Sequence, residues 1–309
     1  MEAGRFRLVR GAGKGQHRRM ERDVVLIGFG EAGSTFAAAG AWGARAAAFD
    51  IDPGRAGAMR TLGVAAQDSM ALALADAPLI LSLVTADQAA QVAQDAAAAL
   101  RPGAVFCDMN SVAPQTKQGA AQAIEAAGGH YVDVAVMAPV DPARLSVSLL
   151  LSGARAGEAE AALATLGFGK TRIVGDQVGR ASAIKMIRSV MVKGIEALTA
   201  ECVLAASQAG VLDEVLASLD ASERPRPWME RADYNLDRML VHGTRRAAEM
   251  EEVVRTLEGL GTGADLTRGT VARQRAIGAL GVKTPPQGLA AKIGRITENE
   301  PEEGRATLP

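Results

Sequence analysis

Short apolar runs alternate with alanine-rich stretches from Asp23 to about Gly175, and this alternation indicates the fold class. Each run is continuously apolar, as expected for strands that are covered on both faces. Helix-length segments such as 31–42 and 86–99 separate the runs. We therefore predict an α/β fold with strand–helix–strand units in a doubly wound, mainly parallel sheet. The predicted strands are VVLIG (24–28), AAAFD (46–50), LILSLV (79–84), AVFCD (104–108), YVDVAV (131–136), SVSLLLSG (146–153) and a last strand at 171–174.

The pattern changes after Gly179, where the strand signals end. A long helical pattern without proline follows, and Gly210 is placed as its C-cap. Gly194 within this helix permits close helix approach, so we expect a homodimer formed through the helical domain. The predicted helices are 180–209, 228–240, 244–260 and 266–280. The predicted organisation is a disordered extension at 1–22, an α/β domain at 23–178, an all-α domain at 179–284 and a tail at 285–309.

Composition limits the partners of this chain of 309 residues. Lys and Arg number 34 and Asp and Glu number 35, which gives a net charge of −1 and no electrostatic footprint for nucleic acid or anionic membrane. Two cysteines and three histidines, with no metal-ligand spacing among them, predict neither a disulfide framework nor a metal site. The chain has no apolar stretch of membrane-span length and no secretory h-region in residues 1–22, so we expect a cytoplasmic protein.

The first predicted strand runs into the sequence GFGEAG, which fits the pattern G-x-G-x-x-G. Gly28 permits the tight turn, Gly30 lets a pyrophosphate approach the backbone, and Gly33 allows close packing of helix and strand. The following helix offers unpaired N–H groups and a positive dipole end to the phosphates. The preceding strand and following helix make this a Rossmann-type dinucleotide site rather than a glycine-rich turn without a ligand.

Asp50 ends the second predicted strand, at the position expected for a ribose-binding acid. A carboxylate can accept hydrogen bonds from both ribose hydroxyls of NAD, whereas it repels the 2′-phosphate of NADP. Asp52 adds to this repulsion. Arg55 is close enough to pair with a phosphate, so NADP stays an alternative to NAD as the cofactor.

Four motifs at matching intervals resemble the β-hydroxyacid dehydrogenase family, which includes 3-hydroxyisobutyrate and 6-phosphogluconate dehydrogenases. The resemblance covers about residues 23–210, and the later helices are similar to the compact helical C-terminal domain of a poorly characterised prokaryotic branch. The motifs are GFGEAG (28–33), LSLVTADQ (81–88), DMNSVAP (108–114) and GDQVGRASAIKMIRS (175–189). This resemblance and the glycine loop imply a cofactor site made of Gly28, Phe29, Gly30, Glu31, Ala32, Gly33, Asp50, Val84, Thr85 and Asn110.

The resemblance places Lys185 in the position of the family's catalytic lysine. A lysine can hold a developing alkoxide and supply its proton if burial and neighbours bring its pKa towards neutrality. Ala181, Ile184 and other small or apolar neighbours favour that desolvation, although a solvated helix lysine is the simpler interpretation. The segment 108–114 is similar to the family's D-x-S-T-x-x-P pattern, with Asn110 in the place of the first serine and Ser111 keeping a hydroxyl. Asn110 and Ser111 are expected to orient the reacting oxygen.

The sequence also departs from the family. Ser189 stands four residues after Lys185, where the family has Asn, and it keeps a donor and an acceptor with shorter reach. The family's paired glycines in D-x-P-V-S-G-G are replaced by Ala138 and Pro139, and proline has no N–H to donate. Val192 replaces the carboxylic acid of 6-phosphogluconate dehydrogenase, which argues against that activity.

The motifs expected to bind the cofactor therefore match the family, whereas the positions expected to bind the substrate differ from it. If the substrate is anionic, side chains must meet its charge, and the candidates are Arg188, His242 and Arg246. His242, Arg245, Arg246 and Glu249 share one helix face, so a solvated face with internal ion pairs is the competing interpretation.

We predict an NAD(P)-dependent dehydrogenase or reductase acting on the hydroxyl or keto group of a small molecule. Lys185 is the general acid/base, with Ser189 and Asn110 as further catalytic residues. The substrate is expected between the dinucleotide-binding domain and an all-α substrate and dimerisation domain. Two alternatives stay open, namely an imine reductase and a cofactor-sensing protein without turnover.

Overall fold

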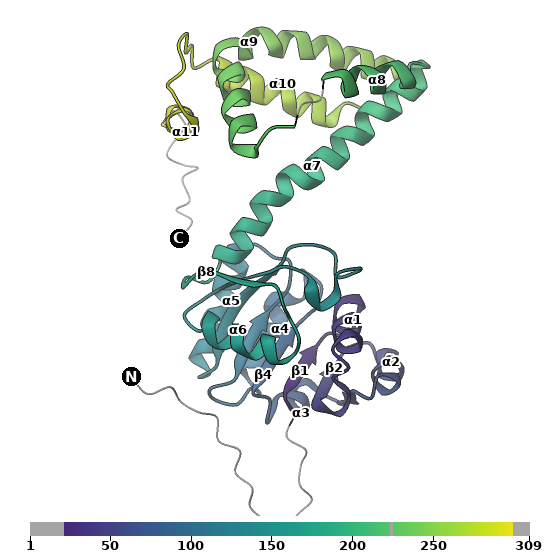
Figure 1. Cartoon of the computed structure of the whole chain (residues 1–309), viewed down its shortest axis with the longest axis vertical. Helices are drawn as coiled ribbons and strands as arrows, with labels where there is room; N and C mark the ends of the chain where they lie inside the picture. Colours follow the sequence, from purple (N-terminus) through teal and green to yellow (C-terminus); the bar gives the residue numbers. More distant parts are fainter. Residues whose placement is uncertain (1–21, 223–224, 299–309) are drawn as a thin grey trace, which may run out of the picture. The chain divides into compact units, whose positions relative to one another are not determined.

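The computed structural model describes residues 22–222 and 225–298, which divide into two compact units between Ile187 and Arg188. Figure 1 colours the elements in chain order, from purple at the N-terminus to yellow at the C-terminus. The division falls inside a helix, Arg180–Ala209, so the domain boundary expected at 178/179 coincides with the start of this helix. Residues 1–21 of the expected extension and 299–309 of the expected tail lie outside the described residues.

An eight-stranded sheet forms the centre of the first unit and has the order β3-β2-β1-β4-β5-β6-β7-β8. All neighbouring strands are parallel except β6 and β7. The strands are β1 (Val24–Ile27), β2 (Ala46–Phe49), β3 (Ala65–Ala66), β4 (Leu79–Ser82), β5 (Val105–Asp108), β6 (His130–Val136), β7 (Leu149–Ser152) and β8 (Thr171–Gly175). This order places the topological switch point between β1 and β4.

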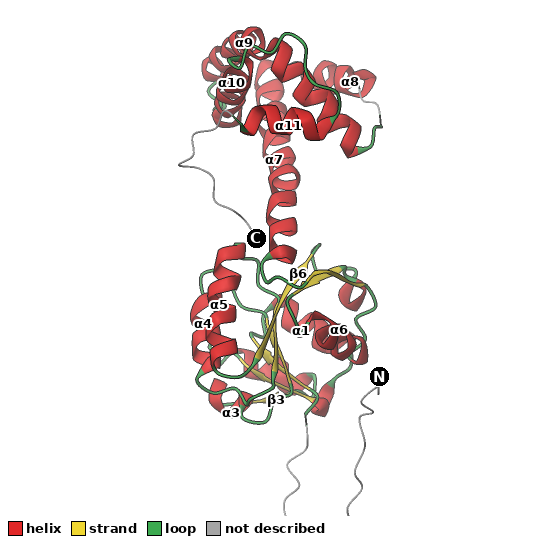
Figure 2. Ribbon diagram, turned by 90° about the vertical axis from the view of Figure 1, so that its left-hand side faces the viewer, coloured by secondary structure: helices red, strands yellow, loops and turns green. Residues whose placement is uncertain are grey.

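Helices cover both faces of this sheet, which confirms the predicted doubly wound α/β fold. One face packs against α1 (Glu31–Ala39), α2 (Arg55–Thr61) and α6 (Ala156–Thr165). The other face packs against α3 (Met70–Leu74), α4 (Ala89–Ala97) and α5 (Pro114–Ala126), and Figure 2 shows α4 and α5 on the opposite side of the sheet from α1 and α6. Two short 3₁₀ turns, η1 (Gly43–Arg45) and η2 (Arg144–Ser146), lie in the connections.

All the secondary-structure elements described in the second unit are helices. The helices are α7 (Arg180–Ala209), whose first residues belong to the first unit, α8 (Leu212–Ser222), α9 (Trp228–Leu260), α10 (Asp265–Gly278) and α11 (Leu289–Thr297). The prediction of two helices at 228–240 and 244–260 is wrong, because α9 is continuous through this region. Gly243 does not break α9, because it is the point of contact with α10. A Cβ on Gly243 would lie 2.4 Å from the carbonyl oxygen of Gln274.

Part of the expected tail is also ordered. Helix α11 packs on α9 through Lys292, whose ammonium lies 2.9 Å from Asp233 Oδ1 and 3.3 Å from Asp237 Oδ1. These contacts raise the pKa of Lys292, led by its hydrogen bond to Asp233. Within the described part of the chain, no helix combines the length and the apolar character of a membrane span, and no three His, Cys, Asp or Glu side chains cluster as metal ligands.

Candidate cofactor and catalytic site

The candidate site begins at the topological switch point of the sheet. The loop Gly28–Gly30 follows β1, and the loop Leu83–Thr85 follows the neighbouring strand β4. Two chain segments diverge here towards opposite faces of the sheet. Open α/β sheets bind their ligands in the crevice that this arrangement leaves at the carboxyl ends of the strands.

The geometry of the glycine loop fits a dinucleotide. Gly28 has φ +94°, and a Cβ there would lie 2.4 Å from the carbonyl oxygen of Leu83. A Cβ on Gly33 would lie 2.5 Å from the carbonyl oxygen of Gly28, so both positions require glycine for the protein's own packing. Gly30 differs, because a Cβ there would meet no atom within 4 Å. The second glycine is therefore free to serve the close approach of a pyrophosphate to the amino end of α1.

Asp50 lies just beyond the end of β2 and is tied to the glycine loop. The backbone N–H of Phe29 donates to Asp50 Oδ2 at 2.6 Å, and the N–H of Asp52 donates to Asp50 Oδ1 at 2.9 Å. Each carboxylate oxygen keeps a lone pair for a further donor, as a ribose hydroxyl would be. Arg55 lies 3.4 Å from Asp52 Oδ2, so its guanidinium has a carboxylate partner.

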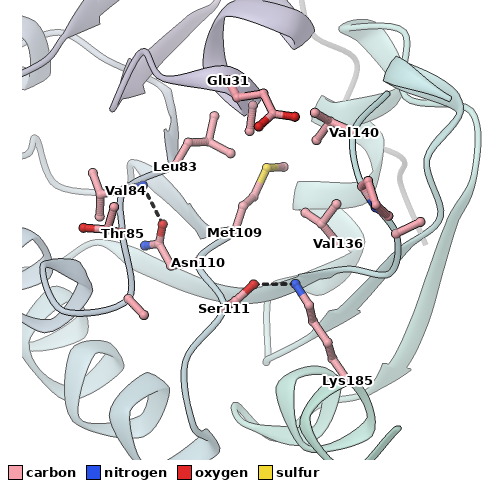
Figure 3. A pocket seen from close by; sticks show the side chains of 14 residues that line it. Glu31, Leu83, Val84, Thr85, Met109, Asn110, Ser111, Val136, Val140 and Lys185 are labelled. Atoms are coloured by element: carbon pink, nitrogen blue, oxygen red, sulfur yellow. Dashed lines mark hydrogen bonds between the residues drawn. The ribbon is translucent and has the colours of Figure 1, made fainter. Parts of the chain in front are cut away.

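A pocket of about 510 Å³ opens in the first unit between these loops and the start of α7. Figure 3 shows Glu31 and Lys185 at different edges of this pocket, with Met109, Val136 and Val140 between them. The predicted residues that it brings together are Glu31, Ala32, Val84, Thr85, Asn110, Ser111 and Lys185. The apolar wall residues Leu83, Met109, Val136 and Val140 escaped the sequence analysis, because apolar residues at strand ends carry no signal that separates a pocket wall from core.

Lys185 and Ser111 meet within this pocket. The ammonium of Lys185, on the second turn of α7, donates a hydrogen bond of 2.5 Å to the hydroxyl oxygen of Ser111 (Figure 3). Ser111 lies in the loop after β5, and the side chain of Lys185 is half-buried. The pair therefore combines a proton donor with a hydroxyl at the surface of a partly apolar pocket.

Asn110 joins the two loops that carry the pocket. Its side-chain Oδ1 accepts a 2.7 Å hydrogen bond from the N–H of Val84, and its Nδ2 donates to Ser82 Oγ at 2.9 Å. Its own backbone N–H donates to Asp108 Oδ1 at 2.9 Å. Asn110 is 5% exposed, so its amide fixes the loop after β4 relative to the loop after β5.

The other four predicted catalytic and substrate-binding residues, Arg188, Ser189, His242 and Arg246, belong to the second unit. Arg188 is exposed and Ser189 half-buried, one turn along α7 from Lys185. His242 and Arg246 are half-buried and one turn apart on α9. Arg245 on the same helix forms an ion pair with Glu249. This pair agrees with the competing interpretation of a solvated helix face with internal ion pairs.

Sequence reasoning also missed a buried polar cluster beneath the pocket. Lys117 on α5 is fully buried, and its ammonium contacts Asp108 Oδ1 at 2.8 Å and Asp133 Oδ1 at 3.5 Å. Tyr131 donates its hydroxyl to Asp108 Oδ2 at 2.5 Å. Burial, together with the charge of Asp108, raises the pKa of Tyr131 well above its ordinary value, so this phenol stays protonated.

The fold, the glycine loop and Asp50 together define an NAD(P)-binding protein of the Rossmann type. Residues 23–175 match the NAD binding domain of 6-phosphogluconate dehydrogenase, and residues 206–277 match a domain of unknown function, DUF1932. The chain belongs to the 6-phosphogluconate dehydrogenase-like family of NAD(P)-binding oxidoreductases that combine these two domains.

Solved structures support the same assignment. A conserved hypothetical protein from Sinorhizobium meliloti 1021 is 37% identical over 91% of this chain and 97% of its own, with a TM-score of 0.56. A conserved protein of unknown function with structural similarity to 3-hydroxyacid dehydrogenases is 25% identical over 89% of this chain and 95% of its own, with a TM-score of 0.52.

An imine reductase from Myxococcus stipitatus, solved in complex with NADP+, shares the fold. It is 19% identical over 83% of this chain and 94% of its own, with a TM-score of 0.67. Among curated proteins, an uncharacterised 28.5 kDa protein from Methanothermus fervidus is 26% identical over 175 residues, and this match covers 57% of our chain and 66% of that protein.

Proposed function

We propose that this protein transfers a hydride between NAD(P) and the hydroxyl or keto group of a hydroxyacid-like or other alcohol substrate. The observation that carries this proposal is the hydrogen bond of 2.5 Å from the Lys185 ammonium to Ser111 Oγ at a pocket lined by Glu31 and Ala32 of the glycine loop. A proton donor and the expected cofactor loop therefore border the same space.

Bound NAD(P) supplies the hydride in reduction and accepts it in oxidation. In the reductive direction Lys185 gives a proton to the carbonyl oxygen as that oxygen becomes negative, so the product is an alcohol. In the oxidative direction Lys185 takes the hydroxyl proton. Ser111 accepts a hydrogen bond from Lys185 and its hydroxyl can orient the same substrate oxygen. Asn110 holds the loop that carries Ser111 and thereby acts as a positioning residue.

The pocket wall favours a substrate that is not held by backbone amides. Ala138 and Pro139 line the pocket where the resembling family has paired glycines, and Pro139 has no N–H for a carboxylate. A negative charge on the substrate would thus need side chains, for which Arg188, His242 and Arg246 of the second unit are our candidates. Val192 replaces a carboxylic acid and supports a substrate other than 6-phosphogluconate.

NAD is the cofactor that we propose within the NAD(P) class. The Asp50 carboxylate beside the glycine loop would repel a 2′-phosphate, and Asp52 places a second negative charge two residues away. Arg55, the cation that could offset this repulsion, lies 3.4 Å from Asp52.

A panel assay tests this function. NADH or NADPH oxidation is followed with the purified protein across aldehydes, keto acids, ketones and imines, for wild type and Lys185→Ala. We expect turnover of a carbonyl compound that is lost in the variant. Carbonyl turnover that survives the substitution removes the proton-transfer role. Turnover of imines alone assigns the protein to C=N reduction, and tight cofactor binding without turnover assigns it to cofactor sensing.

We also propose a homodimer formed through the helical unit. Met191, Ile195 and Leu198 are each 45–49% exposed and recur along α7 at spacings of four and three residues, which places them on one face. Light scattering should give twice the chain mass of 31.9 kDa. A monomeric mass over the micromolar range would refute the dimer.

A further inference from the structure

A row of polar residues crosses four neighbouring strands of the sheet. Ser82, Asp108, Asp133 and Ser152 are direct cross-strand partners on β4, β5, β6 and β7. All four are at most 1% exposed. Buried polar groups in one row of a sheet require partners, because an unpaired buried charge is costly.

Lys117 supplies the cation of this row. Its ammonium donates to the carbonyl oxygen of Asp108 at 2.6 Å and to Asp108 Oδ1 at 2.8 Å, and lies 3.5 Å from Asp133 Oδ1. One ammonium thus faces two carboxylates in the interior of the first unit. A buried ion cluster of this kind is weak as a source of stability, since apolar side chains of similar volume often serve as well.

One end of the cluster leads to the loop that carries Ser111. Asp108 Oδ1, which accepts from Lys117, also accepts a hydrogen bond of 2.9 Å from the backbone N–H of Asn110. Asn110 immediately precedes Ser111 and fixes the loop after β4 through Val84. The position of the Ser111 hydroxyl is therefore linked to Lys117 through a single carboxylate.

The other end leads to the helix that carries Lys185. Asp133 Oδ2 accepts hydrogen bonds from the N–H of Ser182 at 2.9 Å and from its hydroxyl at 3.0 Å. Ser152 Oγ accepts from the N–H of Ala181 at 3.0 Å. These amides belong to the first turn of α7 and have no partner within the helix. The side chains of Asp133 and Ser152 thus cap the amino end of α7 one turn before Lys185. These bonds fix how close α7 lies to the sheet and how it is rotated about its own axis.

We propose that Lys117 is a positioning residue. It locks the Ser111 loop and the first turn of α7 into one register, so that the Lys185 ammonium meets the Ser111 hydroxyl. This inference rests on the proposed function for its catalytic consequence, although the positioning itself is independent of turnover. A merely structural Lys117 would support folding and leave the Lys185–Ser111 pair unchanged in every folded molecule.

Two variants and a matched control test the proposal. Lys117→Met removes the cation and leaves two buried carboxylates. Ser182→Ala keeps all three charges and the backbone N–H, and it removes the hydroxyl bonds to Asp133 Oδ2 at 3.0 Å and to the carbonyl oxygen of Gly179 at 3.1 Å. It tests the link between the polar row and α7 if Lys117→Met does not fold. Lys292→Met is the control, because Lys292 is also a buried lysine between two aspartates, at 2.9 and 3.3 Å, on α11 in the second unit.

The first readout needs no substrate. The folded full chain is treated with limiting amine-modifying reagent, and the rate of labelling at Lys185 is followed by peptide mass spectrometry from pH 6 to 10. We expect Ser182→Ala and Lys117→Met to label Lys185 several-fold faster than wild type and Lys292→Met, because its ammonium loses the fixed bond to Ser111. An unchanged rate and pH profile in every folded variant would overturn the proposal.

The second readout uses turnover, where a substrate has been found. Misplacing a reacting group by about 1 Å costs about 10²-fold in rate, so we expect about a 10²-fold fall in kcat for Lys117→Met and a smaller fall for Ser182→Ala. The Kd for NADH and the number of binding sites should stay near wild type. A fall in kcat that matches the loss of NADH-binding sites would show a structural role and overturn the inference. If wild type turns nothing over, the proposed function fails and labelling alone decides on positioning.

Discussion

Replacing Lys185 by methionine is the sharpest test of the proposed chemistry. The side chain is half-buried and donates a hydrogen bond to the uncharged hydroxyl of Ser111. We therefore expect the free energy of unfolding to change by less than about 1 kcal/mol. Loss of a general acid/base costs about 10²- to 10⁴-fold in rate, which is about 3–5 kcal/mol of barrier height. The effect on catalysis should thus exceed the effect on stability several-fold.

The assay compares kcat/KM for a carbonyl substrate with the Kd for NADH, measured by fluorescence titration. Lys193 provides the control, because it lies two turns further along α7 and is exposed. Lys193→Met should keep wild-type turnover and wild-type NADH binding. The reasoning is refuted if Lys185→Met retains kcat/KM within about threefold of wild type, since a general acid/base typically contributes about 10²- to 10⁴-fold.

Four further predictions follow from single positions. Asp50→Asn removes one negative charge and should shift the ratio of NADPH to NADH affinity towards NADPH by about tenfold, measured by titration with both cofactors. Gly28→Ala should cost about 2–3 kcal/mol of stability and abolish NADH binding, since its Cβ would meet a backbone carbonyl at 2.4 Å and its φ is positive. Gly243→Ala should cost about 2–3 kcal/mol of the free energy of unfolding of the second unit, measured as a lower melting temperature, because its Cβ would meet the backbone of α10. At Gly259 a Cβ meets nothing within 4 Å, so Gly259→Ala should stabilise α9 by up to about 1 kcal/mol. Burial raises the pKa of Cys107 to about 12, so the unfolded chain loses this thiol proton first, and denaturant melts of wild type should weaken between about pH 9 and pH 12 more than those of Cys107→Ala.

The cofactor half of the site could be predicted because its signal is local. Gly28, Gly30 and Gly33 lie within six residues. Gly28 and Gly33 are glycine for the protein's own packing, and Gly30 leaves space in which a pyrophosphate can approach the backbone. Continuous apolar runs likewise predicted seven of the strands within a few residues. The remaining strand, β3 at Ala65–Ala66, has only two residues and carries no pattern that a sequence reader can separate from its surroundings.

The helical unit was predicted less well, because a glycine can either end a helix or allow two helices to pack closely. The predicted gap between the helices 228–240 and 244–260 contains Gly243, and glycine is unfavourable in a helix interior. The structure uses it for close approach of α9 to α10, where a Cβ on Gly278 would lie 2.2 Å from the amide nitrogen of Thr244. Only the partner helix distinguishes a glycine that ends a helix from a glycine at a helix crossing, and the partner is not visible along the chain.

The buried cluster around Lys117 could not be predicted for a related reason. Its members are spread over Asp108, Lys117, Asp133 and Ser182, and they meet only because the strand register aligns Asp108 with Asp133. Lys117 follows the motif DMNSVAP (108–114) by three residues, and a lysine at the start of a helix is usually a solvated residue, since lysines are almost never fully buried unless paired. The available signal was weak: two aspartates at neighbouring strand positions need a cation between them.

Asn110 stands at a motif position, but its side-chain contacts differ from those that the resemblance implies. The resemblance assigned it to the first hydroxyl of a D-x-S-T pattern, where a side chain orients the reacting oxygen. In this chain its amide oxygen accepts from the N–H of Val84 and its amide nitrogen donates to Ser82, so both ends of the side chain hold loops together. A serine hydroxyl has a shorter reach and would have to accept and donate through a single oxygen atom. We infer that the change to asparagine strengthens the loop junction and leaves Ser111, hydrogen-bonded to Lys185, as the hydroxyl that meets the substrate.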